Sequence, residues 1–112
     1  SIIKYLSKKD KYYKEFGETY FNEIKKGFEK GWNLHKKAHC FLHVSYGSVT
    51  FTIMDTNRIK KKVITLKRTL PKILIIPPNF WFKFKSNTKF SIIVNSTNLV
   101  HSKKEVAKLP IE

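Results

Sequence analysis

The alternation of apolar and polar residues in short runs constrains this fold more than any other feature of the sequence. In the clearest run, Thr50 and Thr52 separate Val49, Phe51 and Ile53, which is typical of a β-strand with one buried face. Six further runs have the length and composition of strands: Tyr20 to Ile24, Cys40 to Val44, Val63 to Leu66, Ile73 to Ile76, Phe80 to Phe84 and Phe90 to Val94. The sequence therefore predicts seven short strands.

Turn-forming residues separate these runs. The turns are Asp55-Thr56-Asn57, Leu70-Pro71-Lys72, Pro77-Pro78-Asn79 and Ser86-Asn87-Thr88. A further turn at Tyr46-Gly47-Ser48 predicts a hairpin over residues 39–54. Helical patterns are confined to Lys8 to Glu15 and to one or two turns within Ser102 to Lys108.

Many short strands divided by turns favour a closed barrel or a sandwich, because both arrangements remove exposed sheet edges. A chain of 112 residues suits one domain. We therefore expect a single all-β domain over residues 1–112, with residues 1–15 as an N-terminal extension.

The charge is strongly positive. The chain has 23 basic and 8 acidic residues, a formal net charge of +15, and only Arg58 and Arg68 of the basic residues are arginines. Such a surface attracts polyanions, phosphates or acidic partners. Lysine, however, lacks the planar guanidinium group with which arginine binds phosphate or guanine through two hydrogen bonds, so this charge predicts attraction better than sequence recognition. A compositional bias toward Lys, Ile, Asn and Phe is the alternative source of this charge.

A basic β-barrel could also hold single-stranded nucleic acid on exposed aromatic side chains. Trp81, Phe82 and Phe84 would be the stacking residues in that interpretation. They lie in the most apolar part of the chain, so a core position is the simpler prediction.

The single cysteine and the short apolar runs bear on location. Cys40 has no partner for an intrachain disulfide, which favours a reducing compartment and a cytoplasmic protein. No apolar run approaches the ~20 residues that cross a bilayer, and SIIKYLSKKD is too short and too charged for a signal peptide. Insertion into a membrane is not expected.

Common catalytic and metal-binding motifs are absent. His35, His39 and His43 recur every four residues, but the surrounding pattern is not helical, and on a strand His39 and His43 would lie about 13 Å apart. The chain has no nucleophile-elbow, dinucleotide-binding or phosphate-loop motif, and only Glu18 and Glu23 lie near predicted strands. The residues alone thus predict no metal site and no two-carboxylate glycosidase.

Several segments together resemble a known family. They are FGETYF (16–21), KGWNLHKKAHCFLHVSYGSVTFTIMD (30–55), IIPPNFWFKF (75–84), SIIVN (91–95) and HSKKEVAKLP (101–110). In this order they resemble small cupins of the dTDP-4-dehydrorhamnose 3,5-epimerase-like and dTDP-sugar ketoisomerase group. The resemblance implies a double-stranded β-helix, or jelly-roll barrel, that dimerises through its strands and binds a nucleotide sugar in the barrel mouth.

The resemblance also implies a general base. In the epimerases, a histidine after an Arg-Gly motif removes the proton beside the 4-keto group of the sugar, and His35 stands at that position, with Lys30-Gly31 in place of Arg-Gly. An imidazole titrates near neutrality, as this step requires. Lys30, Lys36 and Lys37 are the expected ligands of the diphosphate.

The remaining site residues depart from the family pattern. The epimerases' proton-donating tyrosine would fall where this chain has Val94 and Asn95, so Tyr46 or His39 is the expected acid. No aspartate follows Asp55 to pair with His35. Trp81 and Asn95 complete the expected substrate-binding set.

The ligand positions of metal-binding cupins correspond here to Asn33, His35, His39 or Cys40, and Phe82, so neither a metal nor another cofactor is expected. The function implied is that of an isomerase, an epimerase or ketoisomerase that acts on a dTDP-4-keto-6-deoxy sugar in cell-surface polysaccharide biosynthesis. The alternatives are a cupin that binds a sugar nucleotide without catalysis and, less favoured, the nucleic-acid-binding barrel.

Overall fold

The computed structural model describes residues 2–110, and nine strands and no helix occur in this range. The strands are β1 (Glu18–Lys25), β2 (Glu29–His35), β3 (Cys40–Tyr46), β4 (Ser48–Met54), β5 (Lys61–Lys67), β6 (Leu74–Ile76), β7 (Trp81–Ser86), β8 (Phe90–Thr97) and β9 (Val106–Leu109). The prediction of an all-β domain is confirmed.

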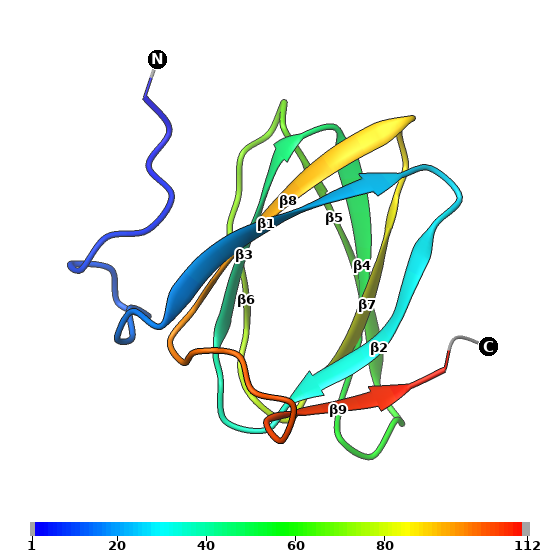
Figure 1. Cartoon of the computed structure of the whole chain (residues 1–112). Coiled ribbons are helices and arrows are strands. Elements are labelled where there is room, and N and C mark those ends of the chain that lie inside the picture. Colours follow the sequence, from blue (N-terminus) through cyan, green and yellow to red (C-terminus); the bar gives the residue numbers. More distant parts are fainter. Residues whose placement is uncertain (1, 111–112) are drawn as a thin grey trace.

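The strands form two antiparallel sheets that face each other (Figure 1). Sheet A has the order β1-β8-β3-β6, and sheet B has the order β5-β4-β7-β2-β9. Side chains from alternate positions of both sheets fill the space between them, and Val49, Phe51 and Ile93 are fully buried there. This two-sheet arrangement is the jelly-roll barrel that the sequence predicts.

Each of the seven predicted strands is present, but the sequence did not reveal β2 and β9. β2 shows no apolar alternation because its inward residues Asn33 and His35 are polar and its register with β7 shifts between Lys30 and Asn33. β9 has only four residues and lies at the edge of sheet B beside β2. Both missed strands border the open end of the barrel, where polar side chains replace the core.

The predicted hairpin over residues 39–54 is wrong. β3 pairs with β6 and β8 in sheet A, whereas β4 pairs with β5 and β7 in sheet B. Gly47, with a φ of 82°, lies at the point where the chain passes from one sheet to the other. Apolar alternation shows that two adjacent strands each bury one face, but it does not show whether they bury it in the same sheet.

The predicted helices are also wrong. Residues 8–12 form turns and residues 13–15 are irregular; the Asp10 carboxylate accepts the Ser7 N–H at 2.7 Å and the Ser7 carbonyl accepts the Asp10 N–H at 2.9 Å. A single turn follows Ser102, whose carbonyl accepts the Glu105 N–H at 3.0 Å, and then β9 begins. Local side-chain bonds of this kind compete with helix formation in short polar segments.

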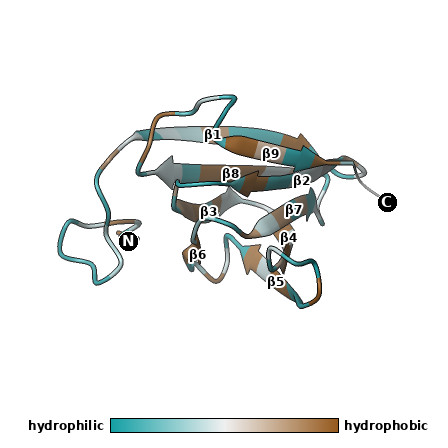
Figure 2. Cartoon of the chain, turned by 90° about the horizontal axis from the view of Figure 1, so that it is seen from below, coloured by the Kyte–Doolittle hydropathy of each residue, from teal (hydrophilic) through white to brown (hydrophobic). Residues whose placement is uncertain are grey.

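The N-terminal segment, residues 2–17, lies outside the barrel against sheet A (Figures 1 and 2). The Tyr5 hydroxyl donates to the Phe41 carbonyl, and the Gly17 N–H donates to the Thr97 carbonyl at 2.8 Å. Phe41 is on the outer side of β3 and is nevertheless buried, because this segment covers it.

Sheet B buries apolar side chains on its outer face as well. This outer cluster consists of Trp32, Leu34, Met54 and Trp81, with Ala107 and Leu109 packed against it. Phe82 and Phe84 point to the opposite side, into the main core. All three aromatic residues of β7 are therefore buried, in agreement with the core prediction.

Replacing Gly47 with alanine is expected to destabilise the protein much more than replacing Gly27. Both glycines have positive φ, 82° and 94°, so either alanine incurs a backbone cost of about 1 kcal/mol. A Cβ at Gly47 would lie 2.6 Å from the Phe90 carbonyl oxygen and closer still to the Ser91 hydroxyl, whereas nothing lies within 4 Å at Gly27.

Urea denaturation should give losses in the free energy of unfolding of about 1 kcal/mol for Gly27→Ala and about 3 kcal/mol for Gly47→Ala. Equal losses would show that the connection between the sheets does not require this close approach.

Candidate functional site

His35 ends β2 and points to the inner side of sheet B. Its neighbour on the same face is Asn33, which stands opposite Phe82 in the register of β2 with β7. The His35 ring lies nearly parallel to the Phe82 ring, with centroids 6.0 Å apart, and only 12% of its side chain is exposed. The imidazole is thus held at the open end of the barrel, at the edge of the core.

A carboxylate orients this imidazole. Glu105 Oε2 lies 3.1 Å from His35 Nδ1, and Glu105 Oε1 accepts the backbone N–H groups of Lys37 and Ala38 at 2.8 and 2.6 Å. An Nδ1–H that donates to the carboxylate leaves the lone pair on Nε2. The arrangement gives His35 one nitrogen fixed by the protein and one that can accept a proton.

The same bonds set the ionisation of Glu105. Burial alone would raise the pKa of this carboxyl, but the N–H groups of Lys37 and Ala38 and the adjacent His35 outweigh it and lower the pKa. Glu105 is therefore charged at neutral pH.

Sequence reasoning missed Glu105 because it looked for an aspartate after Asp55. Only two acidic residues follow Asp55 in the chain, and Glu105 lies in the HSKKEV segment that already carried the family resemblance. A search for either type of carboxylate would have found it.

His35 and Glu105 share a narrow cleft of about 10 Å³, room for about one water molecule, with Tyr20 of β1. Its other lining residues are Glu18, Ala38, Thr97, Leu99, Val100 and His101. The Tyr20 hydroxyl oxygen accepts a hydrogen bond from the Asn95 side-chain amide at 3.0 Å, which leaves the hydroxyl proton free to be donated. Burial raises the Tyr20 pKa, so the group is a protonated phenol at neutral pH.

Asn95 is itself part of the barrel interior. It is 3% exposed, and its Oδ1 atom has no hydrogen-bond partner among residues 2–110. A buried acceptor without a partner is costly. The structure places Asn95, an expected substrate ligand, beside Tyr20.

The loop between β8 and β9 borders the cleft. The His101 N–H donates to Glu18 Oε1 at 2.6 Å, and the Asn98 side-chain oxygen accepts the His39 N–H at 2.7 Å. These bonds hold the loop against β1 and against the segment that leads into β3, both of which belong to sheet A.

The other predicted acids do not line the cleft. Tyr46 is the last residue of β3 and lies about 20 Å along the strand from Cys40, the first. Its side chain is 57% exposed and packs against Phe90. Burial and the charge of Lys14 lower the pKa of His39, whose ring neighbours the N-terminal segment instead of the cleft. The structure separates both residues from the free nitrogen of His35.

The predicted substrate ligands divide into two groups. Lys36 and Lys37 are exposed and border a shallow hollow of about 250 Å³ together with Lys104 and Glu105, next to the His35 site. Trp81 lies in the outer cluster, on the opposite face of sheet B from His35.

Lys30 of β2 pairs with Phe84 of β7. It comes five positions before His35, which places its backbone roughly 16 Å from that of His35 along the strand. The structure thus brings two of the three expected lysines to the His35 end of the barrel.

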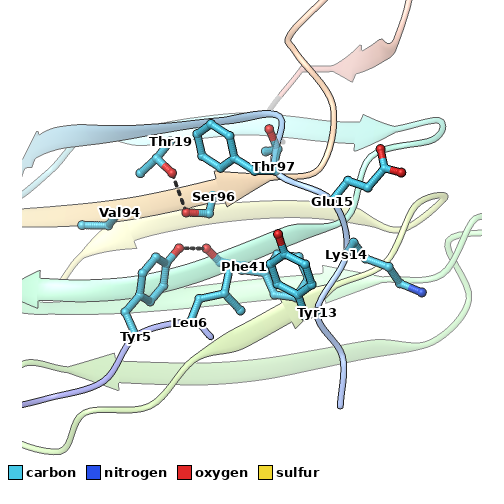
Figure 3. Close-up of a pocket in the computed structure, with 11 residues that line it drawn as sticks. Tyr5, Leu6, Tyr13, Lys14, Glu15, Thr19, Phe41, Val94, Ser96 and Thr97 are labelled. Carbon is cyan, nitrogen blue, oxygen red and sulfur yellow. Dashed lines mark hydrogen bonds between the residues drawn. The ribbon is translucent and has the colours of Figure 1, made fainter. Parts of the chain in front are cut away.

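A second hollow of about 300 Å³ lies under the N-terminal segment (Figure 3). Tyr5, Tyr13 and Phe41 contribute rings to it, and Thr19 and Ser96 share a hydrogen bond of 2.7 Å at its edge. It lies outside sheet A, so the barrel wall separates it from His35.

Residues 2–110 contain no group of three His, Cys, Asp or Glu side chains close enough together to bind one metal ion. The Cys40 thiol lies inside the barrel, and burial raises its pKa to about 12. Over the same range there is no helix long and apolar enough to span a membrane.

Glu105 should make the stability of the protein depend on pH. The pKa of Glu105 is lower in the folded state than its ordinary value of 4.5. The ionised carboxylate therefore stabilises the folded state above pH 4.5, and this stabilisation is lost as the pH falls through the folded-state pKa. Glu105→Gln should lower the free energy of unfolding by about 1–2 kcal/mol at pH 7, and the gap to the wild type should close on acidification.

Urea denaturation between pH 7 and pH 3 measures this gap, and the exposed Glu23→Gln is the matched control. A gap that stays constant with pH would contradict the assignment of the carboxylate.

Comparisons with known proteins place this geometry in a family. The chain is similar to a dTDP sugar isomerase from Desulfovibrio desulfuricans G20, with 23% identity, a TM-score of 0.90 and coverage of 97% of this chain and 74% of that one. It is similar to QdtA, a sugar 3,4-ketoisomerase from Thermoanaerobacterium thermosaccharolyticum crystallised with TDP, with 20% identity, a TM-score of 0.73 and coverage of 82% and 66%.

A dTDP-4-dehydrorhamnose 3,5-epimerase from Elizabethkingia anophelis has 14% identity, a TM-score of 0.76 and coverage of 85% of this chain and 56% of that one. The chain thus spans less than two thirds of the last two proteins, and no curated protein sequence matches it.

These likenesses confirm the predicted cupin-type jelly-roll fold. The family model described as "FdtA: WxcM-like, C-terminal" matches residues 9–106, most of the chain. The chain therefore belongs to the FdtA family of WxcM-like C-terminal domains.

Proposed function

We propose that this protein is a sugar-nucleotide isomerase that acts on a dTDP-4-keto-6-deoxy sugar, by removing the proton next to the ketone. The observation that carries the proposal is the His35–Glu105 pair, which faces a cleft that Tyr20 also lines. The names of the similar proteins, a dTDP sugar isomerase, a 3,4-ketoisomerase and a 3,5-epimerase, support this substrate class. Cell-surface polysaccharide synthesis is the proposed context.

His35 Nε2 is the proposed base. It takes the proton from the carbon beside the ketone, and the electrons of the C–H bond move onto the ketone oxygen as an enediolate forms. The Glu105 carboxylate stabilises the imidazolium through the Nδ1–H bond, as buried carboxylates do for catalytic histidines. In a ketoisomerase the proton returns to the former ketone carbon, while the hydroxyl group on the first carbon loses its proton and the former ketone oxygen gains one. In an epimerase a proton returns to the opposite face of the same carbon and the ketone re-forms.

Tyr20 is the proposed acid, in place of Tyr46 and His39. Its phenol lines the cleft, and the Asn95 amide fixes its oxygen while leaving its proton available. A neutral phenol in a partly buried site can protonate a developing oxyanion or carbanion. Asn95 is then a positioning residue for Tyr20.

Lys36 and Lys37 are the proposed ligands of the diphosphate. They follow His35 directly and stand with Lys104 around the shallow hollow beside Glu105. Ammonium groups at this hollow would hold the anionic end of the substrate near His35.

The proposal predicts deuterium incorporation. A dTDP-4-keto-6-deoxy sugar incubated with the protein in deuterated water should gain deuterium next to the ketone, as measured by mass spectrometry. His35→Asn should stop the exchange, whereas His43→Asn, which changes a histidine on the outer side of β3, should leave it intact. Tyr20→Phe should slow product formation by about 10²–10⁴-fold.

Each negative outcome has a distinct meaning. Saturable binding of dTDP without exchange would favour a cupin that binds a sugar nucleotide but does not catalyse. No affinity for dTDP, measured by calorimetry, would contradict both functions. Affinity for nucleic acid that falls steeply with salt would favour the nucleic-acid-binding alternative.

We also propose that the protein acts as a cytoplasmic homodimer. β1 forms one edge of sheet A, pairs only with β8 among the described strands, and carries Phe21, which is 67% exposed. A long regular edge strand with an exposed aromatic side chain is a template for pairing with a second copy. The lone Cys40, a buried free thiol, is compatible with a reducing compartment.

Sedimentation should therefore give twice the chain mass for the wild type, and Phe21→Glu should shift the protein toward the monomer. Phe28→Glu, at an equally exposed position in the β1–β2 turn, is the control. A wild-type monomer at all concentrations would contradict the proposed dimer.

A further inference from the structure

A second concave site lies on the outer face of sheet B, on the side away from His35. It is a groove of about 240 Å³, lined by Trp32, Met54, Arg58, Lys61, Lys83, Leu109 and Pro110. We call it the outer groove. Its apolar side chains belong mostly to the outer cluster, and its polar side chains are all basic.

Two of the cations stand over the rings of the outer cluster. The Arg58 guanidinium lies 5.7 Å from the centroid of Trp81, and the Lys83 ammonium lies 5.0 Å from the centroid of Trp32. Cation–π contacts of this kind hold long basic side chains in defined places. The two charges are therefore fixed at the groove and do not move freely in solvent.

The turn between β4 and β5 supports the position of Arg58. Arg58 has a φ of 63°, in the left-handed region that non-glycine residues seldom adopt, and its N–H donates to the Asp55 carbonyl at 3.0 Å. The Asp55 carboxylate accepts the Ile59 N–H at 2.9 Å. The acidic side chain nearest to Arg58 in the turn is thus engaged with backbone groups.

The positive charges at the groove exceed the negative ones. Arg58, Lys61 and Lys83 are lining residues, and the one ion pair formed by any of them among residues 2–110 joins Lys83 to Glu29 at 3.5 Å. Within the part of the chain that the structure describes, two unit charges at the groove form no ion pair with a carboxylate. Cations that converge on one groove repel one another, and an anion bound between them removes that repulsion.

The chemistry of the lining identifies the ligand. The planar guanidinium group of arginine can donate hydrogen bonds to two oxygens of one phosphate, and the ammonium group of lysine adds a second positive charge. Trp32, Met54 and Leu109 present an apolar wall beside these charges. We propose that the outer groove binds the phosphate ester of a small molecule with an apolar ring, at a site separate from the His35 cleft and independent of the function proposed for it.

The two tryptophans of the chain, Trp32 and Trp81, both belong to the outer cluster beside this groove, so tryptophan fluorescence reports on its surroundings. Phenyl phosphate, the probe, should change the fluorescence saturably and bind more tightly than inorganic phosphate, because the ring also contacts the apolar wall. Arg58→Gln and Lys61→Gln should each weaken binding roughly tenfold. Lys67→Gln, which removes one charge elsewhere on β5, should not change it.

Calorimetry with the same variants, whose folding is checked by circular dichroism, separates the possible results. No saturable binding by the wild type, or equal weakening by Lys67→Gln, would overturn the proposal, since the latter means non-specific attraction to a basic surface. Binding lost in Lys36→Gln and retained in Arg58→Gln would place the phosphate beside the His35 cleft and would equally overturn it. Equal affinity for phenyl phosphate and inorganic phosphate would contradict the apolar part of the site.

Discussion

The hydrogen bonds to the Glu105 carboxylate hold the functional end of the barrel together. One oxygen accepts two backbone N–H groups, of Lys37 and Ala38, and the other accepts the imidazole of His35. A largely buried carboxylate is tolerated only when its oxygens are paired, so this short polar segment has one favourable position against the barrel. The same contact fixes the ring that the proposed chemistry uses and the segment that leads into β9.

The two faces of β2 explain how one strand serves both structure and function. Its outward residues Trp32 and Leu34 pack in the outer cluster, and its inward residues Asn33 and His35 face the open end of the barrel. Burial of the outer face supplies the apolar contacts that the polar inner face lacks. The barrel can therefore place an imidazole at its mouth without losing the strand that carries it.

The fold was largely predictable because the alternation of apolar and polar residues within each strand shows which face of that strand is buried. Val49, Phe51 and Ile53 alternate in sequence and all point into the core of the structure. The pairing of strands was not predictable in the same way: β3 and β4 look like a hairpin, yet Gly47 carries the chain from sheet A to sheet B. Alternation records which side of a strand is buried, whereas pairing depends on contacts between residues far apart in the chain.

The sequence by itself determined the class of the fold, the position of His35 after Lys30-Gly31 and the excess of positive charge. Only the tertiary structure decided the partners of His35. Glu105 is 70 residues from His35 in the chain, and Tyr20 comes from the opposite sheet, whereas the nearby Tyr46 is carried to the other end of β3. A catalytic group is defined by angles and distances of a few ångströms, and these arise only when two sheets close around a common interior.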